Sequence, residues 1–379
     1  MTLIVRITFT FVLERSTFMY EEIKMNQREQ ETIVNADQLQ QVCSQLYQKA
    51  GVAREYADTI AQMQVLMDLR GVPSHATRGV PGYVRGMISG GTNPNPDIKT
   101  LEDNPASALL DGDRGFGHLV AIHGMNLAIE KARTTSIGIV VVRNSNHFGA
   151  ASSHAIRALE HDMIGFATTN GGGVNVAVFG ARSNSIGNNA LAFAIPVGEE
   201  PPIVLDMACG AAAAGRIGTA RMYNQKIPLG WGLDENGEET DDPSKVAAIL
   251  PAAGAKGSAL AIIMDVLCGP LGGGLMGINK AYNRRNAPPE KIATAHFFFA
   301  INIASLTSVD QFKEEMDEQI RTTRKAEPRK GFDRVTLPGE IEWELTQERR
   351  ANGIPLHKSQ VVTLEELADE LGVSVPWRL

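Results

Sequence analysis

The middle of the chain alternates short apolar runs with longer stretches in which apolar positions recur every three or four residues. Short apolar runs between turn residues are typical of buried strands, and the longer period is typical of helices. Six runs predict strands: residues 108–112, 137–142, 164–170, 185–196, 203–207 and 297–303. Four stretches predict helices: residues 117–134, 150–159, 210–223 and 258–271. The alternation predicts an α/β domain over residues 107–305.

Both ends of the chain show helical periodicity instead. Six helices are predicted there: residues 36–50, 54–69, 83–89, 310–324, 342–352 and 364–371. Helices with an apolar face need a partner surface, so we expect the two groups to pack together. The predicted organisation is a helical domain with a first part at 31–106 and a second part at 306–379, beside the central domain.

Residues 1–30 fit neither pattern. Apolar and polar residues alternate over positions 1–13, and Arg6 falls inside the apolar part, so the segment makes a poor secretory signal. We expect an N-terminal extension that arises from an upstream start codon, with Met19 or Met25 as the natural start.

Composition and charge narrow the class of protein. The 379 residues are 43% hydrophobic and 21% charged, which is typical of a globular enzyme. A net charge of −7 argues against nucleic acid as a partner, because phosphate binding needs a basic surface. Three cysteines without C-x-x-C spacing favour a reducing, cytoplasmic location. The apolar stretch 258–271 contains Asp265 and is shorter than the roughly 18 residues of a membrane span, so we expect no membrane segment.

Two histidines stand where active sites of α/β proteins often lie. His147 lies in the polar stretch 143–149 that directly follows the predicted strand 137–142, at the turn into a helix. His75 follows Ser74 in a break after the helix 54–69. An imidazole has an ordinary pKa near 6.5, so it can exchange a proton near neutral pH. The alternative for either residue is a capping histidine at the edge of the core. The eight histidines show no metal-ligand spacing, so no metal site is predicted.

Three glycine-rich or lysine-containing segments are candidates for binding a cofactor. Residues 272–277 satisfy G-x-G-x-x-G, but the preceding stretch is helical and position 297 is phenylalanine rather than acidic, so we do not expect a dinucleotide fingerprint. The turn at 168–173 follows a strand and lets the backbone approach a ligand. Lys256 precedes a helix start, where anions are favoured. The alternatives are a plain glycine turn and an exposed lysine.

Several short motifs occur in a fixed order along the chain. They are Asp68-Leu69-Arg70-Gly71, Ser74-His75, Asn146-His147-Phe148-Gly149, Asp206-Met207-Ala208, Ile227-Pro228 with Trp231, Thr240-Asp241-Asp242-Pro243, Leu250-Pro251, Lys256-Gly257 and Leu337-Pro338-Gly339-Glu340. Over residues 33–355 this series resembles the type-2 malate/L-lactate dehydrogenase family, which includes ureidoglycolate dehydrogenase, sulfolactate dehydrogenase, 2,3-diketogulonate reductase and piperideine-2-carboxylate reductase. The resemblance implies an oxidoreductase that uses NAD or NADP. It also implies a non-Rossmann central domain with a large mixed sheet, a helical domain formed by both chain ends, and a homodimer.

The resemblance also implies roles for individual residues. His75 and His147 match two histidines proposed as proton carriers, and the sequence does not decide between them. Asp206 matches an aspartate that orients His75, while Ser74, Arg78 and Tyr83 would line the substrate pocket. The implied cofactor contacts are Thr169, Asn170, Gly171, Asp206, Met207, Ala208, Lys256, Gly257, Pro338, Gly339 and Glu340.

The chain departs from the family pattern near this site. Ala76 replaces a glycine, and Gly79 stands where the family has the arginine that binds the substrate carboxylate. Arg78 lies one residue earlier. Asn189-Ala190 and Cys209-Gly210 replace Asn-Pro and Thr-Ser. The expected activity is hydride transfer between nicotinamide and a small 2-hydroxy or 2-oxo acid of the malate, lactate or ureidoglycolate type. The alternatives are reduction of a cyclic imine, and a dimer that binds ligands without catalysis.

Overall fold

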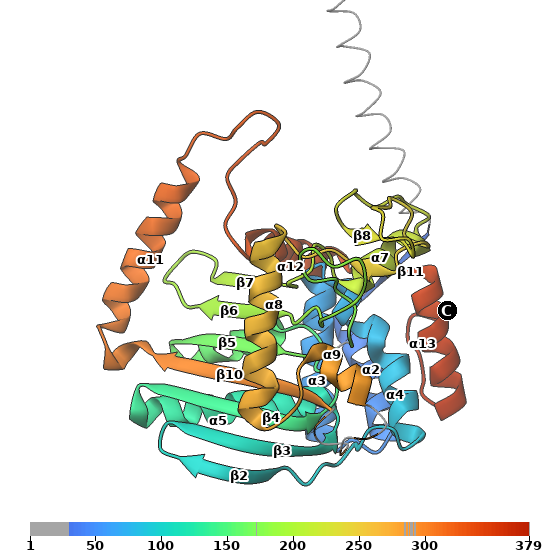
Figure 1. The fold of residues 1–379 in the computed structure, drawn as a ribbon, viewed down its shortest axis with the longest axis horizontal. Helices are drawn as coiled ribbons and strands as arrows, with labels where there is room; N and C mark the ends of the chain where they lie inside the picture. The colour runs from blue at the N-terminus through green and yellow to red at the C-terminus, as the bar shows by residue number, and fades with distance from the viewer. Residues whose placement is uncertain are drawn as a thin grey trace, which may run out of the picture.

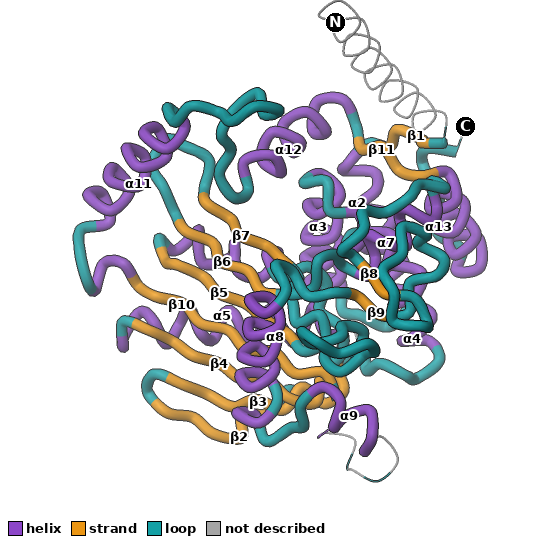
Figure 2. Tube along the Cα trace, turned by 45° about the horizontal axis from the view of Figure 1, so that its top comes forward, coloured by secondary structure: helices purple, strands orange, loops and turns teal. Residues whose placement is uncertain are grey.

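A computed structural model describes residues 30–378 except 172, 284, 285, 287, 289, 290 and 292 (Figures 1 and 2). Nearly all of the expected N-terminal extension therefore lies outside the described residues. The centre of the fold is a seven-stranded mixed sheet in the order β2-β3-β4-β10-β5-β6-β7. Its strands are β2 (Lys99–Asn104), β3 (Ser107–Gly115), β4 (Ile137–Ser145), β5 (Met163–Thr169), β6 (Leu191–Ile195), β7 (Ile203–Met207) and β10 (Thr294–Asn302).

The directions of the strands decide which ends meet. β3 is parallel to β4, while β10 lies between β4 and β5 and is antiparallel to both. β6 is antiparallel to β5 and to β7. The carboxyl ends of β3, β4, β5 and β7 therefore meet at one edge of the sheet, where ligands of open α/β sheets commonly bind. The mixed, non-Rossmann sheet expected from the resemblance is confirmed.

Helices cover both faces of the sheet. α5 (Gly117–Thr135) and α6 (Ser152–Ala155) pack on one face, and α8 (Ala255–Cys268) crosses the other (Figure 1). Side chains of β10 alternate between the two cores, with Phe298 on the α5 side and Phe297 on the α8 side. A Cβ atom on Gly138 would lie 1.9 Å from the carbonyl oxygen of Ala128, so only glycine lets α5 pack this close to β4.

The helical domain is built from both chain ends, as expected. α2 (Ala36–Lys49), α3 (Arg54–Leu69) and α4 (Val80–Ile88) share one apolar core with α13 (Lys358–Leu371). β1 (Glu31–Val34) pairs antiparallel with β11 (Ile354–His357), and α12 (Glu340–Asn352) packs on α3. In contrast, α11 (Val309–Arg324) lies at the far end of the sheet (Figures 1 and 2). There Asp317 accepts hydrogen bonds from the main-chain N–H groups of residues 198–200.

Several predicted elements differ from those in the structure. The helix expected at 150–159 is α6 followed by a 3₁₀ helix, Ile156–His161. β2 was missed because all six of its residues are exposed at the sheet edge and carry no apolar pattern. α7 (Ala214–Met222) begins four residues later than expected, and α8 begins three residues earlier.

The G-x-G-x-x-G match was correctly set aside. It follows α8 through the 3₁₀ helix Pro270–Gly272 and leads into α9 (Gly277–Asn283), so it does not follow a strand. The remaining short strands are β8 (Gly232–Leu233) and β9 (Ala248–Ile249), which pair with each other.

Among the residues that the structure describes, one helical stretch, α8 with the 3₁₀ helix after it, is apolar and long enough to cross a membrane by length and composition alone. The window Ala255–Gly272 spans 18 residues with a mean hydropathy of 1.3, and 44% of it is buried inside the protein. The window is longer than the stretch seen in the sequence because it includes the first turn of the helix. Since α8 contributes Ala261, Met264 and Cys268 to a core with the sheet, its apolar character is partly that of a core helix.

Candidate active site

The structure brings His75 and His147 together. His75 ends the 3₁₀ helix Pro73–His75 after α3, and His147 lies two residues beyond Ser145, the last residue of β4. Their rings stack with centroids 5.5 Å apart and an interplanar angle of 20°. Both side chains keep partial solvent access. The pair thus joins the helical domain to the ligand-binding edge of the sheet.

A carboxylate and a serine act on His75. Asp206 lies on β7, and its Oδ2 accepts hydrogen bonds from Ser152 N at 3.2 Å and Ser152 Oγ at 2.5 Å. Burial lowers the pKa of His75, while the charge of Asp206 raises it. Asp206 keeps solvent access, yet the surrounding protein desolvates its carboxylate and raises its pKa, against the hydrogen bonds from Ser152. Ser74 Oγ lies 2.9 Å from His75 Nδ1, which leaves Nε2 as the ring nitrogen open to a ligand.

Different groups surround His147. Tyr83 Oη lies 2.7 Å from His147 Nδ1, and the main-chain N of Gly149 donates to the same nitrogen at 3.3 Å. Burial, and secondarily the nearby His75, lower the pKa of His147 to about 4. Burial alone raises the pKa of Tyr83, so its hydroxyl stays protonated. Both groups are neutral at physiological pH.

Arg78 lies near His75 as well. Arg78 Nη1 donates to Thr219 Oγ1 on α7 at 2.9 Å, and its charge lowers the pKa of His75. A Cβ atom on Gly79 would lie 2.6 Å from the ring of Tyr83, so a side chain at position 79 would displace Tyr83. Arg78 is therefore the cation that this chain places beside His75.

Asp68 anchors the segment that carries these residues. The main-chain N and the Oγ1 of Thr77 both donate to Asp68 Oδ2, at 3.1 and 2.5 Å. Gln360 Nε2 on α13 donates to Thr77 Oγ1 at 3.1 Å. The turn that presents His75 and Arg78 is thereby tied to both chain ends. The sequence placed Asp68 in a motif but gave no sign of this anchoring role.

Asp68 should also make stability depend on pH. Burial raises its pKa from 3.8 to about 7, so across that interval the folded state holds a proton that the unfolded state has lost. The free energy of unfolding should therefore fall as pH rises through this window, by up to about 1.4 kcal/mol per pH unit. Urea unfolding at several pH values should show that Asp68→Asn removes this part of the slope. Asp310→Asn, at an exposed position of α11, is the control, and equal slopes for wild type and Asp68→Asn would contradict the assignment.

Two residues predicted to contact the cofactor, Thr169 and Asn170, use their side chains for hydrogen bonds to other parts of the protein. Thr169 Oγ1 donates to the carbonyl oxygen of Ala295 at 3.1 Å and lies 2.9 Å from His296 Nδ1. Asn170 donates to Asp265 Oδ1 at 3.0 Å and accepts from Ala295 N at 2.9 Å. These contacts fasten the end of β5 to β10 and α8. His296, which the sequence did not single out, completes the brace through Ser145 Oγ at 2.9 Å.

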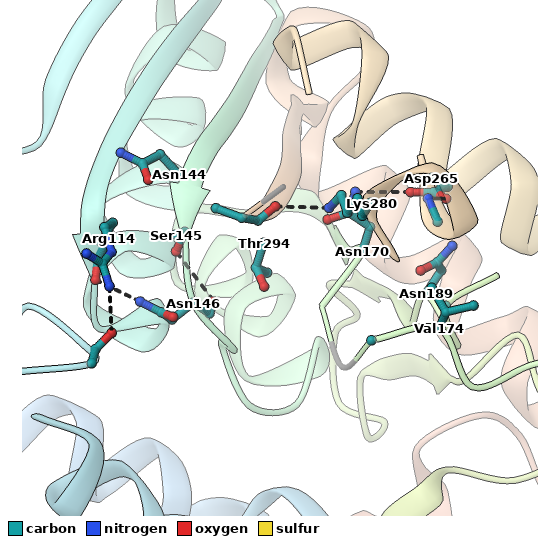
Figure 3. Close-up of a pocket in the computed structure, with 15 residues that line it drawn as sticks. Arg114, Asn144, Ser145, Asn146, Asn170, Val174, Asn189, Asp265, Lys280 and Thr294 are labelled. Carbon is teal, nitrogen blue, oxygen red and sulfur yellow. Dashed lines mark hydrogen bonds between the residues drawn. The ribbon is translucent and has the colours of Figure 1, made fainter. Parts of the chain in front are cut away.

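A cavity of about 670 Å³ opens at the same edge of the sheet (Figure 3). Figure 3 shows Asn170, Asp265 and Lys280 on one side of it and Arg114 with Asn146 on the other. Lys280 donates to the carbonyl oxygen of Ala293 at 2.9 Å, and burial lowers its pKa to about 8. Lys280 and Arg114 are lining cations that sequence reasoning missed, because no motif contains them.

The other predicted cofactor contacts cluster around β7. The carbonyl oxygen of Pro338 accepts from Val204 N at 3.0 Å, and Gly339 has φ +89°, where a side chain would be strained and its Cβ atom would lie 3.0 Å from Val204. Glu340 accepts from Arg324 Nε at 3.0 Å. Lys256 is exposed on the first turn of α8.

The α8 start lies beside the end of β7. A Cβ atom on Gly257 would lie 2.6 Å from the carbonyl oxygen of Cys209. Cys209 comes directly after Met207 and Ala208 in the chain. Residues 338–340 therefore approach β7 at Val204, and residues 256–257 approach the chain just beyond β7 at Cys209.

Comparison with known proteins identifies the family of the chain. A profile described as malate/L-lactate dehydrogenase matches residues 34–365. The chain belongs to the malate/L-lactate dehydrogenase family. This confirms the resemblance seen in the motifs. Among family members, a malate dehydrogenase from Pyrococcus abyssi is 37% identical over 335 residues, which cover 86% of this chain and 91% of the relative.

Two further relatives support the family assignment. An L-sulfolactate dehydrogenase from Methanocaldococcus jannaschii is 36% identical over 329 residues, covering 86% of this chain and 94% of the relative. The solved structure of a malate dehydrogenase from Pyrococcus horikoshii OT3 superposes with a TM-score of 0.82 at 32% identity, covering 92% of this chain and 97% of that one. Within the part of the chain that the structure describes, no group of His, Cys, Asp or Glu residues is arranged to hold a metal ion.

Proposed function

We propose that the protein transfers a hydride between a nicotinamide cofactor, NAD or NADP, and a small 2-hydroxy or 2-oxo acid of the malate, lactate or ureidoglycolate type. The observation that carries the proposal is the stacked pair His75 and His147, with centroids 5.5 Å apart, beside Asp206 and Arg78. This set supplies a proton carrier, a carboxylate to stabilise it and a cation for the acid group of the substrate.

The side chains divide the chemistry as follows. In the direction of oxidation, His75 accepts the hydroxyl proton at Nε2 while its Nδ1 faces Ser74. Asp206 stabilises the imidazolium that forms, as a carboxylate does in other histidine-based sites. Because burial lowers the pKa of His75, the ring is neutral and ready to accept a proton at physiological pH. Arg78 binds the substrate carboxylate, and the ring of Tyr83 packs against the next residue, Gly79. The bound nicotinamide supplies or accepts the hydride.

The residues around β7 and the end of β5 fit such a cofactor. Lys256 is an exposed cation on the first turn of a helix, which suits a phosphate group. The side chain of Thr169 is turned inward and accepts a hydrogen bond from the main-chain N–H of Gly171 at 3.1 Å, so a ligand would meet the small Gly171 of this turn and not the Thr169 hydroxyl. Met207 and Ala208 are half-buried between these segments. Together they support the cofactor contacts expected from the family.

The first experiment follows the absorbance of NADH and of NADPH with oxaloacetate, pyruvate, sulfopyruvate and piperideine-2-carboxylate, and of NAD and NADP with ureidoglycolate. Turnover of an oxo or hydroxy acid supports the proposal. Turnover of the cyclic imine alone would replace it with the reductase alternative. Absence of any turnover from folded protein would favour a ligand-binding dimer without catalysis.

We also propose that the protein forms a homodimer through the outer face of α8. This face exposes Leu260, Ile262, Ile263 and Val266, with 39–53% of each residue accessible, although the opposite face of the helix lies in the core. An apolar patch of this kind on a helix commonly marks a protein interface. A second copy of the chain can cover it symmetrically, because a two-fold axis brings the same patch of both copies together.

Ile263→Glu should therefore shift the protein from dimer to monomer. A buried, unpaired carboxylate in the interface costs several kcal/mol, enough to weaken association by roughly two to three orders of magnitude. Analytical ultracentrifugation over a range of concentrations measures the change. Ile88→Glu is the matched control, since Ile88 is equally exposed on a helix, at 55% against 53% for Ile263. A variant at position 263 that sediments like wild type would refute the interface.

A further inference from the structure

We propose that Tyr83 and the main-chain N–H of Gly149 hold His147 as the neutral tautomer with its proton on Nε2, so that His147 donates a hydrogen bond to the reacting oxygen and does not carry the proton. This rests on the proposed function and assigns unequal roles to the two histidines. His75 remains the proton carrier, and Tyr83 becomes a positioning residue.

Gly149 fixes the state of His147 Nδ1. A main-chain N–H can only donate, and it points at His147 Nδ1 from 3.3 Å, so that nitrogen must present its lone pair. Gly149 can do this because it has φ +80°, and a Cβ atom there would lie 2.5 Å from His118 Nε2. The left-handed conformation and the missing side chain are both required. In a neutral imidazole whose Nδ1 accepts, the proton is on Nε2.

Tyr83 donates to the same nitrogen. Its Oη lies 2.7 Å from His147 Nδ1, and its ring packs against Phe116 and His118, with centroids 5.2 and 5.1 Å away. Among the residues described, His147 is the hydrogen-bond partner of this hydroxyl. If Nδ1 carried the proton, Tyr83 could turn to accept it, but the N–H of Gly149 would then face another proton. Because Tyr83 and Gly149 both donate to Nδ1 of His147, the tautomer with its proton on Nδ1 is disfavoured.

The surroundings of His147 disfavour a third state, the imidazolium. Five titratable groups from five separate segments interact with His147 through charge or a hydrogen bond. They are His75, Tyr83, His118, His154 and His296. None is a carboxylate. His75, by contrast, has Asp206 to stabilise a positive charge. Geometry and surroundings agree that a proton taken from the substrate goes to His75.

The reaction balances with these roles. In oxidation, the O–H bond of the substrate breaks and its proton bonds to His75 Nε2, while hydride passes from the carbon to the nicotinamide. The Nε2–H of His147 donates to the same oxygen throughout, so no bond forms or breaks at His147. Stabilisation of a developing negative charge by a fixed donor is among the larger contributions to enzyme rates.

The test reads the tautomer directly. In ¹⁵N-histidine NMR of the full-length protein, without substrate, we expect His147 to show Nε2–H and a bare Nδ1 from about pH 6 to about pH 9, because neither donor titrates in that range. Tyr83→Phe should introduce a population with Nδ1–H. It should also lower kcat about tenfold, the rate equivalent of one hydrogen bond, with a smaller change in KM.

Tyr47→Phe is the matched control. Its hydroxyl is buried and also makes a 2.7 Å hydrogen bond, to Gln64, outside the site. It should lose stability like Tyr83→Phe but keep the tautomer and kcat of wild type. An Nδ1–H signal in the wild type, titration of His147 within the range, or an unchanged tautomer in Tyr83→Phe would overturn the inference. Because the tautomer is read without substrate, this result is independent of whether any acid is reduced.

Discussion

Replacing His75 with alanine is expected to lower kcat by roughly 10²–10⁴-fold, the usual contribution of one positioned acid or base. Of the stacked pair, His75 is the histidine that has a carboxylate, Asp206, acting on it and one ring nitrogen free for substrate. Steady-state rates with the substrate found in the cofactor assay would measure the loss. In the oxidation direction, the wild-type rate should rise with pH through a value below the ordinary pKa of histidine, since burial lowers that of His75. The variant should lack this rise.

His123→Ala is the control for the His75 experiment. His123 is exposed on α5, away from the site, and its loss should leave the rate and its pH dependence unchanged. A thermal unfolding curve like that of wild type would show that His75→Ala folds. If folded His75→Ala kept the wild-type rate, His75 would not be the proton carrier and the division of roles between the histidines would fail.

Replacing Arg78 with alanine is expected to lower kcat/KM by roughly 10²–10⁴-fold, mostly through KM. Charge-assisted hydrogen bonds contribute about 1.5–3 kcal/mol each, and a guanidinium can make two to a carboxylate. Arg78→Lys should recover only part of the loss, because an ammonium cannot bind the carboxylate in the same forked geometry. The same assay, run over a range of substrate concentrations, separates KM from kcat.

The KM of Arg78→Ala shows whether Arg78 binds the substrate carboxylate. Arg85→Ala, which removes an exposed ion pair with Glu370, should leave KM unchanged. If Arg78→Ala also left KM unchanged, Arg78 would serve only to tie its turn to Thr219 on α7. The substrate carboxylate would then be held by another group. Restoring an arginine at position 79 is not a clean test, because it would displace Tyr83.

Much of the fold followed from local patterns. The prediction for β7 was correct at every residue, and His147 was placed correctly just beyond β4. Both depend on interactions within a few residues. The position of β10 did not follow, because nothing local in residues 294–302 shows that the strand lies between β4 and β5. β1 and β11 were missed for the same reason, since each is only four residues long and pairs across more than three hundred positions.

The sequence predicted which residues form the candidate site, but not the hydrogen bonds between them. Motif order identified His75, His147 and Asp206, which the structure places together. The contact between Tyr83 and His147 joins residues 64 positions apart, and periodicity carries no information about it. The inward-facing side chains of Thr169 and Asn170 were also invisible in the sequence, because a polar residue after a strand can equally face a ligand or brace a neighbouring strand. The cofactor contacts stay predictions.

The central position of β10 has a consequence for biosynthesis. A ribosome that has made 293 residues has made every other strand of the large sheet, yet β4 and β5 then have no bond to each other and both present open edges. The helical core is equally incomplete until α13 has emerged. Domains usually fold one after another from the N-terminus during synthesis. Here the sheet closes only after residue 302 and the helical core only after α13, so we expect the nascent chain to expose open strand edges and apolar helix faces for most of its time on the ribosome.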